Sequence, residues 1–294
     1  MKCSDFSDAF LLKSATIAAV SVAALLIIGK AYAYRLTGSL SIEASLIDSL
    51  LDGFVSIINF FAVRQALTPA DDDHRFGHGK VEALAGLFQS LFIAGSSLWL
   101  LKEVILRITS PEIVVFSAAA VGVMIAATVL TLILVLWQRY VIKRTNSIAI
   151  TADSLHYQTD IATNIGVLLS FFLSVFCNTP IIDWIVAVLI AIYIFKTSYE
   201  IGKRSFDILM DRELPNTIAD QIKALAWQHP SVRGVHDLRT RSSGRHTFIQ
   251  MHLDLDADLT LRDSHEISED IEQKVITMFP DADIIIHQDP HYGK

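Results

Sequence analysis

The sequence has few cysteines and no excess of positive charge. Its 294 residues include two cysteines, Cys3 and Cys177, which lie far apart and have no cysteine partner at metal-site spacing. A disulfide framework is therefore excluded, and we interpret both cysteines as incidental. The formal net charge of −7 argues against nucleic acid as a partner. We interpret most of the acidic excess in the C-terminal third as a solvated surface.

The sequence also lacks the motifs of several other protein classes. It contains no P-loop, no Gly-x-Gly-x-x-Gly segment and no nucleophile elbow. The chain is therefore not predicted to hydrolyse ATP through a P-loop, to bind a dinucleotide or to carry a hydrolase nucleophile. His265-Glu266 opens like a zinc-protease motif, but His-Glu-Ile-Ser-Glu lacks the second histidine. The N-terminus carries Asp5 and Asp8, and no small-residue cleavage site follows a short apolar core. We therefore expect no cleavable signal peptide.

Apolar residues are abundant: 52% of the chain is hydrophobic and the mean hydropathy is +0.45. A helix needs about 20 apolar residues to cross a bilayer. Six candidate segments are centred on 14–34, 40–62, 81–106, 113–138, 147–176 and 181–202. The remainder is ordinary polar sequence. We predict two domains: a transmembrane domain of six helices over residues 1–210, and a cytoplasmic α+β domain over residues 211–294.

Basic residues predict how the chain is oriented. Lys and Arg gather after the second, fourth and sixth segments, at Arg64, Arg75, Lys80, Arg139, Lys143, Arg144, Lys203, Arg204 and Arg212. The opposite loops carry Arg35 and Arg107 and little else. Since cytoplasmic loops are enriched in Lys and Arg, both termini and the C-terminal domain are expected in the cytoplasm.

The C-terminal part reads as a small α+β domain. Helical periodicity covers residues 216–228 and 264–279, and strand patterns cover 232–240, 246–255 and 283–287. Ser242-Ser243-Gly244 is a turn signal between the first two strands. The order α-β-β-α-β predicts a three-stranded sheet with both helices on one face.

Two apolar segments each contain a pair of ionisable residues four apart: Asp48 with Asp52, and His156 with Asp160. This spacing puts each pair on one helix face. Ionised side chains are rare at bilayer depth, cost several kcal/mol and are usually functional. Three carboxylates and an imidazole form a ligand set for a divalent metal, with Zn²⁺ first and Fe²⁺, Mn²⁺ or Cd²⁺ as alternatives. The competing interpretation is that these groups cap or hydrogen-bond helices near the membrane edge.

Two further stretches have metal-ligand chemistry. The loop 71–80 after the second segment combines three aspartates with two histidines, which fits either a metal site or a solvated, charge-balanced loop. The C-terminal domain carries a second set, namely His236, His252, His265, His287 and Asp289. Histidine is common in this chain, so these residues fit either a metal site or separate surface and core groups.

In combination, these motifs resemble the cation diffusion facilitator family, in the bacterial branch of YiiP and the ferrous-iron-efflux proteins. The matching stretches are Asp48-x-x-x-Asp52, His156-x-x-x-Asp160, Pro69–Lys80, Leu209–Pro215, His236–Arg241 and Ile285–Pro290. Together they cover nearly the whole chain. The resemblance implies a dimeric, proton-coupled exporter of divalent metals in the bacterial inner membrane. It also implies six membrane helices and a metallochaperone-like (ferredoxin-like) cytoplasmic domain.

Carried over residue by residue, the resemblance assigns three metal sites. It implies that the transport site is Asp48, Asp52, His156 and Asp160, and that a loop site is Asp71, His74 and His78. It also implies a two-metal site at the dimer contact, formed by His236, His252, His265, His287 and Asp289. Lys80 and Asp211 match a charge cluster at the membrane–cytoplasm boundary. Zinc-restricted branches have histidine where this chain has Asp48, so the pattern resembles a less selective branch.

We therefore predict a homodimeric antiporter that exchanges Zn²⁺, or a close relative, for protons by alternating access, and that is not an enzyme. Zinc is expected both as the transported ion and as a structural or regulatory ion, without an organic cofactor. The expected partners are metal ions, protons, the lipid bilayer and a second copy of the chain. Two alternatives remain: a membrane-anchored metal sensor or buffer, and a passive metal channel.

Overall fold

The computed structural model describes residues 3–37, 40–109, 118–177, 181–244 and 246–293, and the fold below refers to these residues. The chain divides into two compact units. One comprises Met1–Pro69 and Val81–Phe206, and the other comprises Ala70–Lys80 and Asp207–Lys294. The loop 70–80 is therefore grouped with the C-terminal part, not with the two helices that it connects.

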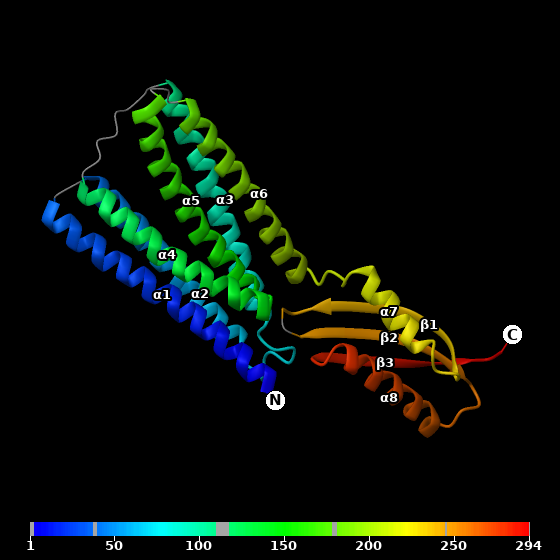
Figure 1. Ribbon diagram of the computed structural model, residues 1–294. Helices are drawn as coiled ribbons and strands as arrows, with labels where there is room; N and C mark the ends of the chain where they lie inside the picture. The colour runs from blue at the N-terminus through cyan, green and yellow to red at the C-terminus, as the bar shows by residue number, and fades with distance from the viewer. Residues whose placement is uncertain (1–2, 38–39, 110–117, 178–180, 245, 294) are drawn as a thin grey trace. The chain divides into compact units, whose positions relative to one another are not determined.

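The first unit is built from long helices (Figure 1). They are α1 (Cys3–Thr37), α2 (Leu40–Ala66), α3 (Lys80–Thr109), α4 (Ala118–Thr145), α5 (Ile148–Cys177) and α6 (Ile181–Leu209). Helix α4 ends where Asn146 takes a φ of 51°, a left-handed conformation that asparagine tolerates at a helix C-terminus. Helix α5 follows almost at once, so α4 and α5 pack as neighbours.

The helices are long and apolar enough to cross a membrane. Among the described residues, four stretches meet this criterion: Ser7–Leu36, Ser45–Ala66, Lys80–Leu106 and Val121–Thr145. Many large apolar side chains on these helices are exposed, for example Ile28 and Trp99, both at 66%. Such surface is suited to lipid and not to water. The helical transmembrane domain is thus confirmed with four spans, whereas a count of six remains a prediction.

Helices α1, α2, α4 and α5 pack around shared buried clusters. One cluster joins all four helices through Leu12, Ala15, Val63, Val141, Ala149 and Ile150. A Cβ on Gly202 of α6 would lie 2.7 Å from the Ser90 hydroxyl of α3, which shows that these two helices approach each other closely. Figure 1 shows these two helices side by side. The interior thus combines apolar packing with small residues at close helix contacts.

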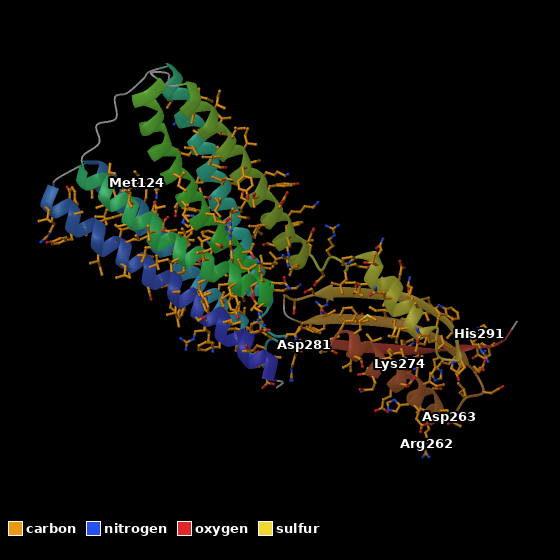
Figure 2. The ribbon with its side chains drawn as sticks, in the orientation of Figure 1. Met124, Arg262, Asp263, Lys274, Asp281 and His291 are labelled. Atoms are coloured by element: carbon orange, nitrogen blue, oxygen red, sulfur yellow. The ribbon has the colours of Figure 1, made fainter. Side chains whose placement is uncertain are left out.

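The second unit contains the predicted α+β domain. Its elements are α7 (Asn216–Ala226), β1 (Val232–Ser242), β2 (Thr247–Asp256), α8 (Leu261–Met278) and β3 (Ala282–His291). Thr260 begins α8 by accepting a hydrogen bond from the Asp263 backbone N–H, a typical N-cap. Figure 2 shows Arg262 and Asp263 at the outer end of α8, pointing away from the sheet. The core comprises buried residues of the sheet and both helices, among them Ile222, Ile249, Met251 and Ile271.

The sheet has the order β1-β2-β3, with β1 antiparallel and β3 parallel to β2. This register pairs His236 with His252 and His252 with His287. Three histidines from three strands therefore form one row across the sheet. Directly paired residues point to the same face, so the register brings together residues that are distant in sequence.

Candidate metal sites

Helices α2 and α5 bring three of the four predicted transport-site residues together. Ligand atoms of Asp52, His156 and Asp160 all lie within 4.8 Å of one another. His156 Nε2 lies 2.8 Å from Asp52 Oδ1, and the histidine is buried while both carboxylates are partly buried. Each residue lies on an apolar helix, so these polar groups have one another as partners in a largely apolar environment. Two carboxylates and an imidazole in this arrangement can hold a divalent metal ion.

The fourth predicted residue, Asp48, lies outside this cluster. It is one turn before Asp52 on α2, and its side chain is exposed. Neighbouring contacts fix the two helices around the cluster: Tyr157 on α5 is hydrogen-bonded to Ser56 on α2 at 2.8 Å. The centroids of the Phe92 and His156 rings lie 6.1 Å apart, and the two rings pack edge to face. Packing therefore fixes the helix positions around Asp52, His156 and Asp160.

Two ionisable residues near this cluster were not singled out from the sequence. Lys30 on α1 donates from Nζ to the Ser49 hydroxyl at 2.6 Å and to the Ser45 carbonyl at 3.1 Å. Asp153 on α5 is fully buried. Each was visible as a charge within an apolar segment, but neither belongs to an i, i+4 pair of metal ligands. A lone charge in an apolar segment was therefore the sequence signal that could have identified both residues.

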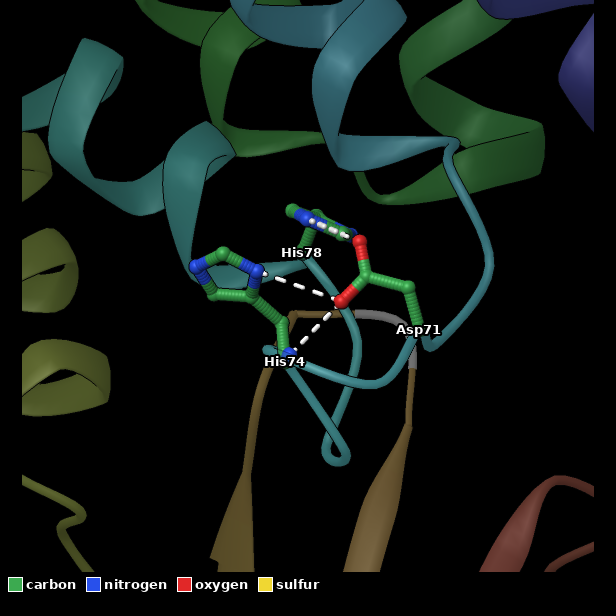
Figure 3. Close-up of side chains that lie close together, drawn as sticks. All are labelled: Asp71, His74 and His78. Carbon is green, nitrogen blue, oxygen red and sulfur yellow. Dashed lines mark hydrogen bonds and ion pairs between the residues drawn. The ribbon is translucent and has the colours of Figure 1, made fainter.

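The loop 70–80 forms a second cluster (Figure 3). Asp71 Oδ1 accepts from the His74 backbone N–H at 2.6 Å and lies 3.3 Å from His74 Nδ1. Asp71 Oδ2 lies 3.4 Å from His78 Nε2. The His74 backbone hydrogen bond is the main reason why the pKa of Asp71 is lowered, so this carboxylate stays ionised. His78 is buried, and its Nδ1 has no partner among the described residues.

The same loop is attached to the sheet. Arg241 Cζ on β1 lies 4.7 Å from the centroid of the Phe76 ring and 4.6 Å from the centroid of the Phe248 ring. Lys80 Nζ lies 2.8 Å from Asp211 Oδ1, which Arg241 also contacts at 3.3 Å. Partial burial favours a higher pKa for Asp211, but hydrogen bonds from Lys80 and Arg241 lower it. The charge cluster predicted from Lys80 and Asp211 thus includes Arg241 as a second cation.

The third cluster lies on the histidine row of the sheet. Ligand atoms of His236, His252 and Asp289 lie within 4.8 Å of one another. Asp289 Oδ2 is 2.8 Å from His252 Nδ1 and 3.4 Å from His236 Nε2. Its other oxygen, Oδ1, is 3.3 Å from His287 Nε2. The His252 hydrogen bond is the main cause that lowers the pKa of Asp289. One ionised carboxylate thus has histidines at both oxygens, an arrangement that can bridge two metal ions.

The fifth residue of that predicted set is not part of the cluster. His265 lies on α8 and is exposed. Among the described residues, the ligand atoms that converge are those of His236, His252 and Asp289, and His265 is not one of them. Another carboxylate does approach the cluster: Asp254 Oδ1 lies 3.2 Å from His236 Nε2. It follows His252 by two positions on β2, so strand alternation could have indicated that it shares the same face.

Family comparisons cover both units. Residues 16–210 match the model of the cation efflux transmembrane domain, and residues 214–291 match that of the cation efflux protein cytoplasmic domain (ZT_dimer). The chain is 46% identical to the cation-efflux pump FieF of Shewanella oneidensis over 281 residues, covering 96% of this chain and 95% of the relative. It is 43% identical to FieF of Shigella boydii serotype 18 over 280 residues, covering 95% and 93%.

A solved structure resembles the C-terminal part. It is the metal-bound C-terminal domain of the CzcD transporter from Thermotoga maritima, with 29% identity and a TM-score of 0.24, covering 25% of this chain and 87% of that structure. Cation efflux proteins are membrane transporters and not enzymes. The two family models and the full-length relatives lead to one conclusion: this chain belongs to the cation efflux family of divalent metal transporters, in the branch of the FieF pumps.

Proposed function

We propose that the chain exports Zn²⁺ from the cytoplasm in exchange for protons, and that Asp48, Asp52, His156 and Asp160 form its transport site. The observation that supports this most is the convergence of Asp52, His156 and Asp160 within membrane helices. Asp48 is the fourth ligand in this proposal. Its place one turn from Asp52 lets a side-chain rotation bring it to the ion.

The choice of metal follows from the ligands. Oxygen ligands with one imidazole and no thiolate suit Zn²⁺, and Fe²⁺, Cd²⁺ and Mn²⁺ remain secondary candidates. The charge of the site favours a divalent ion. The carboxylates of Asp48, Asp52 and Asp160, when ionised, carry three negative charges, and the Lys30 ammonium interacts electrostatically with all three. A divalent ion balances the charge that remains.

Proton exchange follows from the hydrogen bond between His156 and Asp52. At 2.8 Å, a hydrogen lies between His156 Nε2 and Asp52 Oδ1. A metal ion bound by both atoms needs a lone pair on each, so the hydrogen that they share must leave the pair, whichever atom carries it. Metal entry from the cytoplasm would thus release protons, and protonation from the opposite side would favour metal release. Alternating access then couples an inward proton gradient to outward metal flux.

The other two clusters have regulatory or structural roles in this proposal. The set Asp71, His74 and His78 binds one ion in the loop. His236, His252, His287 and Asp289 bind metal on the sheet, with His265 contributed at the contact between two copies of the chain. The match to a ZT_dimer domain supports a homodimer. The basic loops support an inner-membrane topology of six spans with both termini in the cytoplasm.

The test is zinc flux in proteoliposomes that contain Asp52→Ala or Asp160→Ala. Each substitution removes a ligand from a small set, so we expect flux to be abolished while folding and dimerisation persist. Glu200→Ala is the control, since Glu200 is an exposed carboxylate on α6, and it should leave flux unchanged. Normal flux in either site variant would refute the assignment. Metal binding without flux in the wild type would instead indicate a sensor or buffer.

A further inference from the structure

Asp153 is a buried carboxylate held by two other helices. Its relative exposure is 0%, and its oxygens accept from Gln89 Nε2 on α3 at 3.2 Å and from Gln138 Nε2 on α4 at 2.7 Å. Both glutamines are buried as well. A buried carboxylate is costly unless its oxygens are hydrogen-bonded. This three-residue group, the amide clamp, therefore joins α5 to α3 and α4 at one point.

The amide clamp acts on the helix face that carries the proposed ligands. Asp153 precedes His156 by three residues and Asp160 by seven. At 3.6 residues per turn these positions lie along one stripe of α5. Whatever fixes the direction of Asp153 about the helix axis therefore also fixes the direction of His156 and Asp160. In the proposed site, this stripe of α5 must face Asp52 on α2.

We propose that Asp153 is a positioning residue of the transport site. Its two hydrogen bonds set the rotation of α5, so that His156 and Asp160 face Asp52. This inference rests on the proposed transport site. It assigns no metal contact to Asp153 itself: the clamp acts through the orientation of α5.

Two substitutions separate the hydrogen bonds of Asp153 from its charge. Asp153→Ala removes both acceptors and leaves two buried amides unpaired. Asp153→Asn removes the charge but can keep both bonds. Its carbonyl can accept from Gln89, and its NH₂ can donate to Gln138 Oε1 once that amide turns over. Gln138 Oε1 has no partner among the described residues, so this acceptor is available.

A second buried carboxylate supplies a matched control. Glu82 on α3 accepts from the Ser147 hydroxyl and from the Ala149 backbone N–H, the latter at 3.4 Å. It also joins α3 to α5, but at the beginning of α5, about two turns before His156. Glu82→Ala therefore weakens the packing of the same helices without releasing the ligand stripe locally.

The experiment measures KM and maximal rate for Zn²⁺ in proteoliposomes of the full-length protein. Mutation of a residue that orients a metal ligand without binding the metal itself typically lowers metal affinity by about 10- to 100-fold. We expect Asp153→Ala to raise KM by about tenfold or more, Asp153→Asn to stay within about threefold, and Glu82→Ala within about twofold. If Asp153→Ala does not fold, Gln138→Ala replaces it, with KM expected to rise by about threefold or more.

The outcomes distinguish this inference from the proposed function. If Asp52→Ala abolishes flux while Asp153→Ala and Gln138→Ala keep the wild-type KM, the positioning role is overturned. If Asp153→Asn is as impaired as Asp153→Ala, the charge matters and the hydrogen-bond argument is wrong. An equal rise in KM for Glu82→Ala would reduce Asp153 to a general packing role and also overturn the proposal. Normal flux in Asp52→Ala would instead refute the transport site.

Discussion

Gly79 connects the loop cluster to the sheet through a backbone contact that leaves no room for a side chain. A Cβ at this position would lie 2.0 Å from the Ser243 carbonyl oxygen and 3.2 Å from its carbon. Real Cβ atoms essentially never come within 3.0 Å of a neighbour. Both neighbouring atoms belong to backbone, so no side-chain rotation can relieve the clash. In Gly79→Ala, one of the two segments must move by about 1 Å.

This movement should weaken metal binding at the proposed loop site of Asp71, His74 and His78. His78 directly precedes Gly79, so it is displaced when the loop is the segment that moves. A zinc–nitrogen bond is about 2.0–2.1 Å long, and a displacement of about 1 Å breaks it unless the loop rearranges. Overpacking of this kind typically costs about 1–3 kcal/mol. Because about 1.4 kcal/mol is a factor of ten, we expect zinc affinity at the loop to fall by about fivefold to 150-fold.

The assay is a zinc titration of the full-length protein, compared with His74→Ala to isolate the contribution of the loop. Gly95→Ala is the matched control, because a Cβ at Gly95 meets nothing within 4 Å. It should leave binding unchanged and can stabilise α3 by up to about 1 kcal/mol. If Gly79→Ala binds zinc at the loop like the wild type and melts at the same temperature, the packing argument is wrong.

Three further predictions test other parts of the structure. Asp48→His replaces a proposed oxygen ligand by an imidazole, so transport of Cd²⁺ or Mn²⁺ should fall more than transport of Zn²⁺; an unchanged metal profile would show that Asp48 does not set selectivity. His156→Asp should still bind zinc but shift the pH dependence of transport and the number of protons released per ion, measured by calorimetry in buffers of different ionisation enthalpy. Identical proton counts would mean that His156 is a ligand only. Hydrogen bonds from Arg233 at 3.0 and 2.8 Å lower the pKa of Asp256, so its stabilising contribution is fully present above the unfolded pKa of about 3.9 and is lost as the pH falls through the lower pKa of the folded state. Asp256→Asn should therefore lower the melting temperature at pH 7, and this difference should shrink as the pH falls below about 3.9. A difference that does not change with pH would contradict this.

Local patterns in the sequence were enough to predict the helical transmembrane domain and the order of elements in the α+β domain. Apolar length predicted the helices, and turn residues placed the ends of β1 and β2 to within two residues. Strand β3 (Ala282–His291) is longer than the predicted 283–287. The i, i+4 spacing of His156 and Asp160 placed both on one face of α5, where the structure has them. These properties depend on residues close in the chain, so they can be read without knowledge of tertiary contacts.

Other features depend on contacts between distant segments, which spacing does not reveal. The alignment of His236, His252 and His287 follows from strand register, and the grouping of loop 70–80 with the sheet follows from contacts such as Phe76 with Phe248. The role of Asp153 likewise required the positions of glutamines on two other helices. Asp48 and His265 remain predicted ligands, because a side-chain rotation and a second copy of the chain lie beyond the described contacts.

Simultaneous recording of zinc and proton movement in the same proteoliposomes tests the central claim most directly. With an imposed pH gradient, the wild-type protein should move Zn²⁺ and protons in opposite directions at a fixed ratio, and reversing the gradient should reverse the zinc flux. Asp160→Ala should abolish both movements together. Zinc flux that continues without counter-movement of protons, or that ignores the direction of the gradient, would identify a passive channel and contradict the proposed exchange.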